Sequence, residues 1–149
     1  PAPSAGLLAH VGAYLRARAA AGVVIEVTGP NWVEVRVSAR LVATSQARAI
    51  GLVDAARTAL DRFLHPLQGG LDGAGWPFGR VPRRSDVNRI LAGVPGVDHV
   101  RGLQVTCTPP PPPLDDALSD DELADLAGLM VFAGPHALEL AGVAGEVTP

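Results

Sequence analysis

Residues 33–66 read VEVRVSARLVATSQARAIGLVDAARTALDRFLHP, and this stretch decides the class of fold. Its first part, residues 33–41, alternates apolar with mostly polar side chains, which is typical of a strand that has one face toward a core and one toward water. Residues 49–64 carry apolar side chains at helical spacing, and Pro66 ends that pattern because its ring disfavours helical geometry at the preceding residue. A strand followed by an amphipathic helix predicts helices packed on a sheet.

Two further elements are predicted on the N-terminal side of this stretch. Residues 5–20 repeat apolar side chains at helical spacing, with Ser4 as the N-cap, and predict a helix. Residues 23–27 alternate like a strand, and we expect them to pair with residues 33–41 as a β-hairpin around the Gly29-Pro30-Asn31 turn.

On the C-terminal side, a short helix over residues 86–91 and a strand over residues 97–107 are expected, with a β-bulge near Gly102 where the alternation changes phase. These few helices cannot cover both faces of a small sheet. We therefore expect residues 1–107 to form an α+β two-layer sandwich with a ferredoxin-like tendency, in which a mainly antiparallel sheet carries its helices on one face.

Residues 108–149 look different from the sandwich. Five consecutive prolines, residues 109–113, predict a stiff polyproline II linker of roughly 15 Å. A short helix with a capping box is expected to follow over about residues 119–127, and residues 129–132 and 137–140 are expected to pair as a hairpin. This segment is therefore interpreted as a linker and an extended C-terminal arm that docks elsewhere.

Composition narrows the function classes. The net charge is −3, which argues against a general binder of nucleic acid or of anionic membranes. No apolar run approaches the roughly 18 residues that a membrane span needs, so no direct membrane insertion is expected. All 12 cationic residues are Arg; coding bias and the preference for Arg at protein interfaces both explain this. The start at Pro1, without Met, suggests a fragment of a longer chain.

The residues that carry most enzyme chemistry are scattered. Cys107 is the single cysteine, which excludes an internal disulfide framework, and none of the four histidines lies in a nucleophile motif. Asp98 and His99 are the only close pair, but adjacent strand residues point to opposite faces, so a structural hydrogen bond is expected for His99 instead of metal binding. The chain contains no Lys, so the P-loop pattern fails. No catalytic residue, cofactor or metal ligand is predicted.

The most unusual stretch is the glycine loop, residues 69–80, which reads GGLDGAGWPFGR. Its glycines permit close backbone approach, whereas Trp76, Pro77 and Phe78 are bulky and apolar. Such a loop is fixed by docking, either on its own sandwich or on a neighbouring chain, and both interpretations stay open. Trp32 lies on the polar face of its strand, where it either covers neighbouring side chains or anchors an interface.

The stretch from His65-Pro66-Leu67 through the glycine loop to Val94-Pro95-Gly96-Val97-Asp98-His99-Val100 resembles the C-terminal region of baseplate J-like proteins, which are wedge subunits of contractile phage tails and contractile injection systems. The resemblance is specific over residues 65–100 and weaker from about 5 to 107. Family members usually have an aromatic and a hydroxyl residue after the arginine, whereas Val81-Pro82-Arg83-Arg84 follows Arg80 here. The linker and arm lie outside the resemblance.

The resemblance implies a structural, non-enzymatic wedge subunit without a cofactor. Its implied partners are other wedge subunits, copies of itself, and proteins near the hub or spike and the sheath. It would assemble in the cytoplasm into a phage tail-like particle, released or virion-associated, and help to trigger sheath contraction. The candidate interface residues are Trp76, Pro77, Phe78, Arg80, Trp32 and His99.

Two other functions remain open from the residues. The first is a regulatory α+β module that binds a small molecule under the glycine loop, with Arg80, Asp98 and His99 as its polar groups. The second is an enzyme that uses Asp98 and His99 as a base pair, although no nucleophile or oxyanion partner can be named for it.

Overall fold

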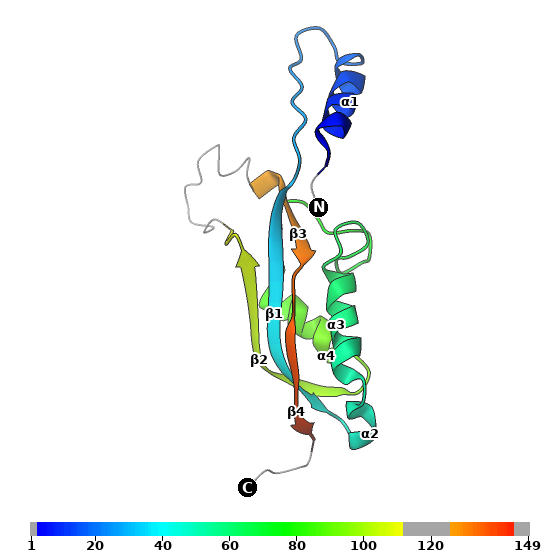
Figure 1. The fold of residues 1–149 in the computed structure, drawn as a ribbon, viewed down its shortest axis with the longest axis vertical. Helices are drawn as coiled ribbons and strands as arrows, with labels where there is room; N and C mark the ends of the chain where they lie inside the picture. The colour runs from blue at the N-terminus through cyan, green and yellow to red at the C-terminus, as the bar shows by residue number, and fades with distance from the viewer. Residues whose placement is uncertain (1–2, 112–125, 145–149) are drawn as a thin grey trace. The chain divides into compact units, whose positions relative to one another are not determined.

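A computed structural model describes residues 3–111 and 126–144 of the chain. The chain divides into two compact units, an N-terminal unit of residues 1–31 and a sheet unit of residues 32–149 (Figure 1). This division differs from the predicted boundary at residue 107, because the sheet draws strands from both sides of that position.

The N-terminal unit consists of helix α1, Ala5–Arg16, and a chain without regular secondary structure over residues 23–30. The Ser4 side chain caps α1 as predicted, accepting a hydrogen bond from the Leu7 N–H at 3.2 Å. The helix ends at Arg16 and not near residue 20. The predicted hairpin is wrong, because residues 23–27 form no strand.

The sheet unit is built on one long central strand, β1, Asn31–Ala43. Strand β2, Val97–Thr108, pairs antiparallel with one side of β1. The register shifts between Ser38 and Arg40 of β1, opposite the predicted bulge at Gly102, where φ is 59°. Strands β3, Leu129–Ala133, and β4, Ala137–Val143, both pair with β1.

The two C-terminal strands correct the prediction of a hairpin and of a separate arm. β3 and β4 do not pair with each other; each pairs with β1, and β4 does so in parallel, so the sheet is mixed. Between them, the Gly134 N–H donates to the Val35 carbonyl at 2.9 Å, and the His136 Nδ1 accepts from the Val37 N–H at 3.1 Å. The described part of the predicted arm is therefore integral to the sheet. Most of the predicted helix near residues 119–127, and the last two prolines of the linker, residues 112–113, lie outside the described residues.

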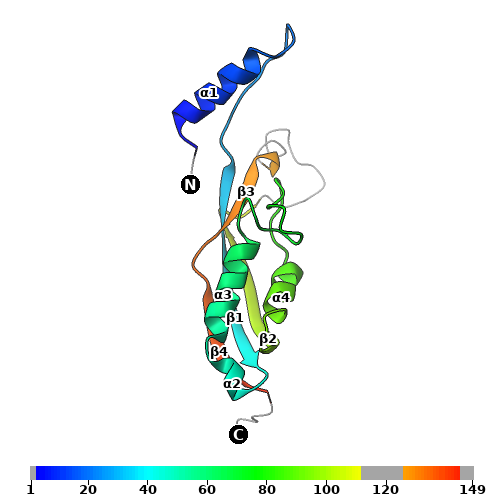
Figure 2. The ribbon, with the colours of Figure 1, turned by 90° about the vertical axis from the view of Figure 1, so that its right-hand side faces the viewer.

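Three helices lie between β1 and β2: α2, Gln46–Ala49; α3, Leu52–Phe63; and α4, Arg84–Ala92. The predicted long helix is thus two helices, because Gly51 adopts a left-handed conformation with φ of 72° between them. Figure 2 shows α3 and α4 side by side over the same face of the sheet. This arrangement confirms the predicted α+β two-layer sandwich.

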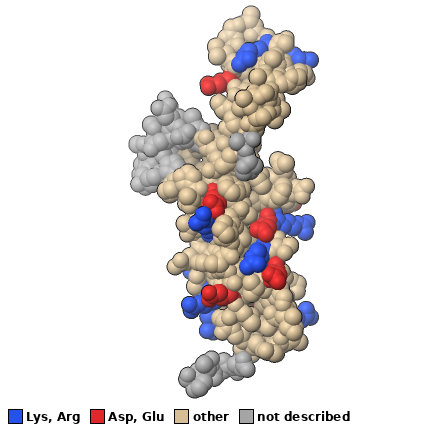
Figure 3. Space-filling view, in the orientation of Figure 1, with Lys and Arg blue, Asp and Glu red and all other residues tan. Residues whose placement is uncertain are grey.

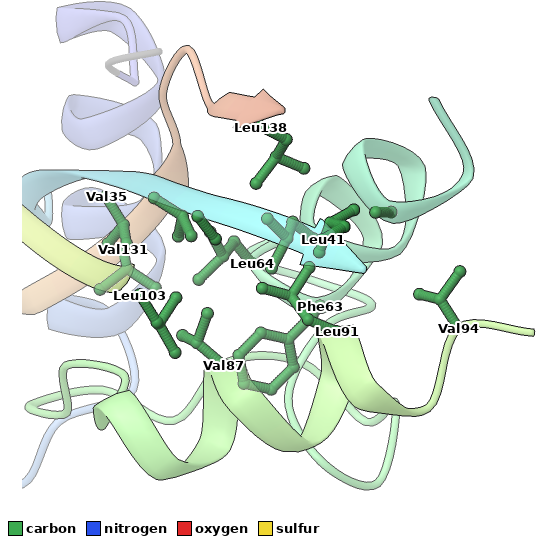
Figure 4. Packing of buried hydrophobic residues seen from close by; sticks show 14 of the residues in the cluster. Val35, Leu41, Phe63, Leu64, Val87, Leu91, Val94, Leu103, Val131 and Leu138 are labelled. Carbon is green, nitrogen blue, oxygen red and sulfur yellow. The ribbon is translucent and has the colours of Figure 1, made fainter. Parts of the chain in front are cut away.

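The core fills the space between the sheet and helices α3 and α4 (Figure 4). From β1, Val35 and Leu41 are fully buried, and their polar strand neighbours face away from the helices. Leu60 of α3, Leu91 of α4 and Val131 of β3 are fully buried as well. Burial of such side chains contributes roughly 1.5–3 kcal/mol each, so β3 stabilises the sandwich as directly as the helices do.

Candidate protein-interaction surface

The glycine loop returns onto the end of α3 through backbone hydrogen bonds. The His65 Nδ1 accepts from the N–H groups of Leu67 and Gln68, each at 3.2 Å, and so fixes the turn at the start of the loop. The Gly70 N–H donates to the Phe63 carbonyl, and the Trp76 N–H donates to the Pro66 carbonyl, both at 2.8 Å. The loop is therefore tied down at both of its ends.

Close approach of backbone explains two of the loop glycines. A Cβ at position 69 would overlap the carbonyl oxygens of Phe63 and His65, so only glycine fits beside the end of α3. Gly79 has φ of 75°, and its N–H donates to the Leu129 carbonyl at 3.0 Å. This second contact fixes the loop to the first residue of β3, which lies 50 positions later in the sequence.

Trp76 docks inside its own unit. Its side chain is buried, with 8% of the residue exposed, and its ring packs edge-to-face against Phe63 with the ring centroids 5.1 Å apart. The indole Nε1 donates to the Arg80 carbonyl at 2.6 Å, which satisfies its polar atom. The hypothesis that Trp76 itself cements separate chains is therefore wrong; Trp76 is a core residue that holds the loop in place.

The loop and the residues just before it carry three large apolar side chains that are mostly exposed in the described part of the chain. Phe78 and Leu71 are each 60% exposed, and Leu67, just before the loop, is 78% exposed. We call these three residues the outer loop face. They account for most of the exposed large apolar side chains in the described part of the sheet unit, which also has Ile50 and Leu140. Sequence reasoning selected Phe78 but missed Leu67 and Leu71, although leucine beside glycine in a polar turn was a usable signal.

A cleft of about 560 Å³ opens beside the loop. Its wall combines apolar atoms of Leu71, Trp76 and Pro77 with the charged residues Arg80 and Asp86, among others. Asp86 is already engaged, because its carboxylate accepts from the Arg83 N–H at 3.3 Å. Asp98 and His99 do not line this cleft, so the polar groups expected for a small-molecule site are not brought together.

His99 lies on β2 and is held by two polar neighbours. Its Nδ1 is 2.7 Å from the Asp98 Oδ2, and its Nε2 accepts from the Arg101 Nε at 2.8 Å, which places the ring proton on Nδ1. The expected structural hydrogen bond is thus confirmed, although the adjacent Asp98 provides it. The described residues contain no group of three or more His, Cys, Asp or Glu side chains placed to hold a metal ion.

Trp32 is half-buried and packs edge-to-face against Phe132 of β3, with the ring centroids 6.0 Å apart. This contact supports the interpretation that the ring covers neighbouring side chains. Farther along the same face of β1, the Arg36 Nε pairs with the Glu34 carboxylate at 2.8 Å, and this hydrogen bond lowers the pKa of Glu34. Figure 3 shows cationic and anionic side chains interspersed over this view of the molecule, without a field of one sign.

Comparison with known proteins assigns no family. No family model matches the chain, and no curated protein matches it. Within the described part of the chain, no helix is both long enough and apolar enough to cross a membrane. The geometry of the glycine loop is therefore the main basis for a functional proposal.

Proposed function

We propose that this chain is a structural wedge component of the baseplate of a contractile tail or injection system. In this role it links neighbouring baseplate subunits between the hub or spike and the sheath. The observation that carries the proposal is the outer loop face: apolar side chains held outward on a loop whose inner side is fixed by Trp76. The resemblance of residues 65–100 to baseplate J-like proteins supports the same role.

The loop is suited to binding because it is ordered before any partner arrives. Its hydrogen bonds to Phe63, Pro66 and Leu129 fix the backbone, so little conformational entropy remains to be lost on association. Phe78 then presents a large apolar ring at a fixed position, and aromatic side chains of this kind often dominate binding energy at protein interfaces. Exposed apolar groups of this size also favour burial against a partner over contact with water.

The proposed mechanism is mechanical. Contacts through the outer loop face hold neighbouring subunits in the arrangement that keeps the sheath extended. A receptor signal then favours a second arrangement with different contacts, and the difference in contact free energy decides which state is populated. In this proposal the chain assembles in the cytoplasm, carries no enzymatic activity, and functions only as part of a phage tail-like particle.

The alternative function, a regulatory module that binds a small molecule, has the cleft beside Arg80 as its candidate site. We favour assembly because Trp76 and Asp86, two of the groups that line the cleft, already have intramolecular partners for their polar atoms.

The test is incorporation of variant chains into the native complex. Phe78→Ser and Leu71→Ser remove the outer loop face, and Ile50→Ser is the matched control because Ile50 is an exposed apolar residue outside the loop. We expect the loop variants to be lost from purified ring- or wedge-shaped particles while the control is retained. Equal incorporation of all three variants, or purification of the native chain as a monomer with a bound metabolite, would contradict the proposal.

A further inference from the structure

The N-terminal unit contains a strand-like segment without a sheet. Residues 23–27 read VVIEV, and β-branched residues of this kind favour strands. Val24 is 94% exposed, and residues 24–30 make no backbone hydrogen bond within the described part of the chain. A segment with this composition and unpaired backbone groups is suited to joining the edge of a sheet.

The neighbouring strand in sequence cannot accept this segment, because both sides of β1 are occupied. On β1, Val35 is opposite Cys107 of β2 on one side, and its carbonyl accepts from the Gly134 N–H on the other. Leu41 likewise lies between Val100 of β2 and Leu140 of β4. Pairing of residues 23–27 with β1 would therefore require displacement of a strand.

The outer edge of β2 is open among the described residues. β2 is the last strand on its side of the sheet, and residues 103–108 run without interruption beyond the bulge at Gly102. Val105 and Cys107 are opposite the buried residues Val37 and Val35, so they point to the core side of the sheet, yet both are only half-buried. A strand added beside them would complete the cover of these two side chains.

We propose that residues 23–27 of one copy of this chain add as a strand to the outer edge of β2 in a second copy. The apolar and polar alternation of the two segments matches. In this pairing the apolar residues of the segment lie beside the core-side residues of β2; they are Val23, Ile25 and Val27. Glu26 then lies on the polar side of the sheet, with Gln104 and Thr106.

Other pairings are less favourable. The edge made by β3 and β4 is interrupted by Pro135, which has no N–H to donate, and by Gly142 with φ of 145°. Within one chain, residues 28–30 connect the segment to β1, so Val27 and Asn31 are four Cα–Cα steps apart and span at most about 14 Å. A strand added outside β2 lies two strand spacings from β1, about 10 Å, but residues 23–27 form no such strand within their own chain.

This inference goes beyond the proposed function, because it names the partner and the mode of pairing and does not use the glycine loop. Each copy supplies one donor segment and one acceptor edge. Such a head-to-tail contact builds a closed ring when the rotation between neighbouring copies adds up to a full turn, and an open series of copies when it does not.

The native Cys107 makes a disulfide test possible in the full chain. Ile25→Cys and Val27→Cys place thiols on the same side as Cys107, and Val24→Cys is the matched control on the opposite side. Oxidation with copper phenanthroline is carried out near pH 8.5, since burial raises the pKa of the Cys107 thiol and only the thiolate reacts. Far-UV circular dichroism checks that each variant is folded.

We expect Ile25→Cys or Val27→Cys to give a ladder of disulfide-linked oligomers, in a yield about tenfold above that of Val24→Cys, because neighbouring strand residues point to opposite faces. Adding Cys107→Ser should reduce this ladder to dimers at most. Equal yields for the three variants, a ladder that survives Cys107→Ser, monomers only, or a disulfide within one chain would each overturn the inference. None of these results would affect the proposal for the glycine loop.

Discussion

The N-terminal unit and the sheet unit both carry many apolar side chains, yet they place them differently. In the sheet unit, Val35 and Leu41 are fully buried, because β1 has strands on both sides and helices over one face. In the N-terminal unit, Gly12 is the only buried residue among those described, and Leu7 and Val24 are exposed. The apolar content of a segment therefore does not show whether it belongs to a core. Burial depends on how many helices and strands pack around that segment. Apolar residues without such neighbours are candidates for contacts with other chains.

The same contrast is repeated within the glycine loop. Trp76 points inward to Phe63 and supports the fold, whereas Phe78, two residues later, points outward and has little cover. If this interpretation is correct, stability should depend on the inward residues and assembly on the outward ones. The following predictions separate these two roles.

The largest effect is expected for Trp76→Ala. This change removes a buried indole and its contact with Phe63, so the free energy of unfolding should fall by about 3–5 kcal/mol. Urea denaturation followed by circular dichroism measures this loss. Trp76→Phe is the control, since it keeps most of the apolar volume and loses chiefly the hydrogen bond to the Arg80 carbonyl. A loss below about 1 kcal/mol would mean that the indole is not part of the core.

Gly69→Ala should have the next largest effect on stability. The added Cβ overlaps the carbonyl oxygens of Phe63 and His65. The backbone must shift to make room for it, and this shift should lower the free energy of unfolding of the sheet unit by about 1–3 kcal/mol. Gly6→Ala is the control, because its Cβ meets open space on helix α1 and alanine favours the helix. The melting temperatures of the two variants give the comparison; equal values would show that the turn at residue 69 is not tightly packed.

Stability of the sheet unit should also fall in mild acid through His136. Burial lowers the pKa of His136 and Arg57 lowers it further, while Asp61 partly opposes the shift. The unfolded state therefore binds protons more readily than the folded state below about pH 6.5, so this contribution to stability is present above that pH and is lost below it. Protonation also removes the acceptor for the Val37 N–H.

The control for this prediction is His136→Gln, which retains an acceptor for Val37 but cannot titrate in this range. We expect the stability difference between wild type and variant to shift in favour of the variant as the pH falls. Denaturation curves at several pH values measure it, and the other histidines contribute equally to both proteins. A difference that does not change with pH would show that His136 is accessible to protons in the folded state.

The smallest effect on stability is expected for Phe78→Ser. Because the ring is mostly exposed, the free energy of unfolding should change by no more than about 0.5 kcal/mol. Incorporation into particles should nevertheless be lost, which distinguishes this residue from Trp76. Denaturation and particle purification are compared on the same variant. A large loss of stability for Phe78→Ser would contradict this prediction and show that Phe78, like Trp76, stabilises the fold.

Local sequence patterns predicted the elements whose partners are close in sequence. The Ser4 cap, the amphipathic α3, the alternation of β1 and the bulge at Gly102 all follow from side-chain spacing and backbone preferences. The two-layer sandwich followed from these elements in turn.

Pairing between distant segments could not be predicted in the same way. Residues 23–27 and β3 both have strand-like composition, but only β3 pairs with β1, because a central strand has two sides and β2, β3 and β4 occupy both of them. The direction in which each residue of the glycine loop faces was likewise undetermined. The close approach at Gly69 and the hydrogen bond from Trp76 to Arg80 arise only when the loop is folded.

Photo-crosslinking at position 78 in assembled particles tests the central claim most directly. A benzophenone amino acid in place of Phe78 keeps an aromatic ring at the outer loop face, and the same substitution at Ile50 serves as the control. We expect illumination to join position 78 to a different polypeptide chain, with little product from position 50. Crosslinks from position 78 that stay within its own chain, or no crosslink at all in intact particles, would contradict the role of this loop in assembly.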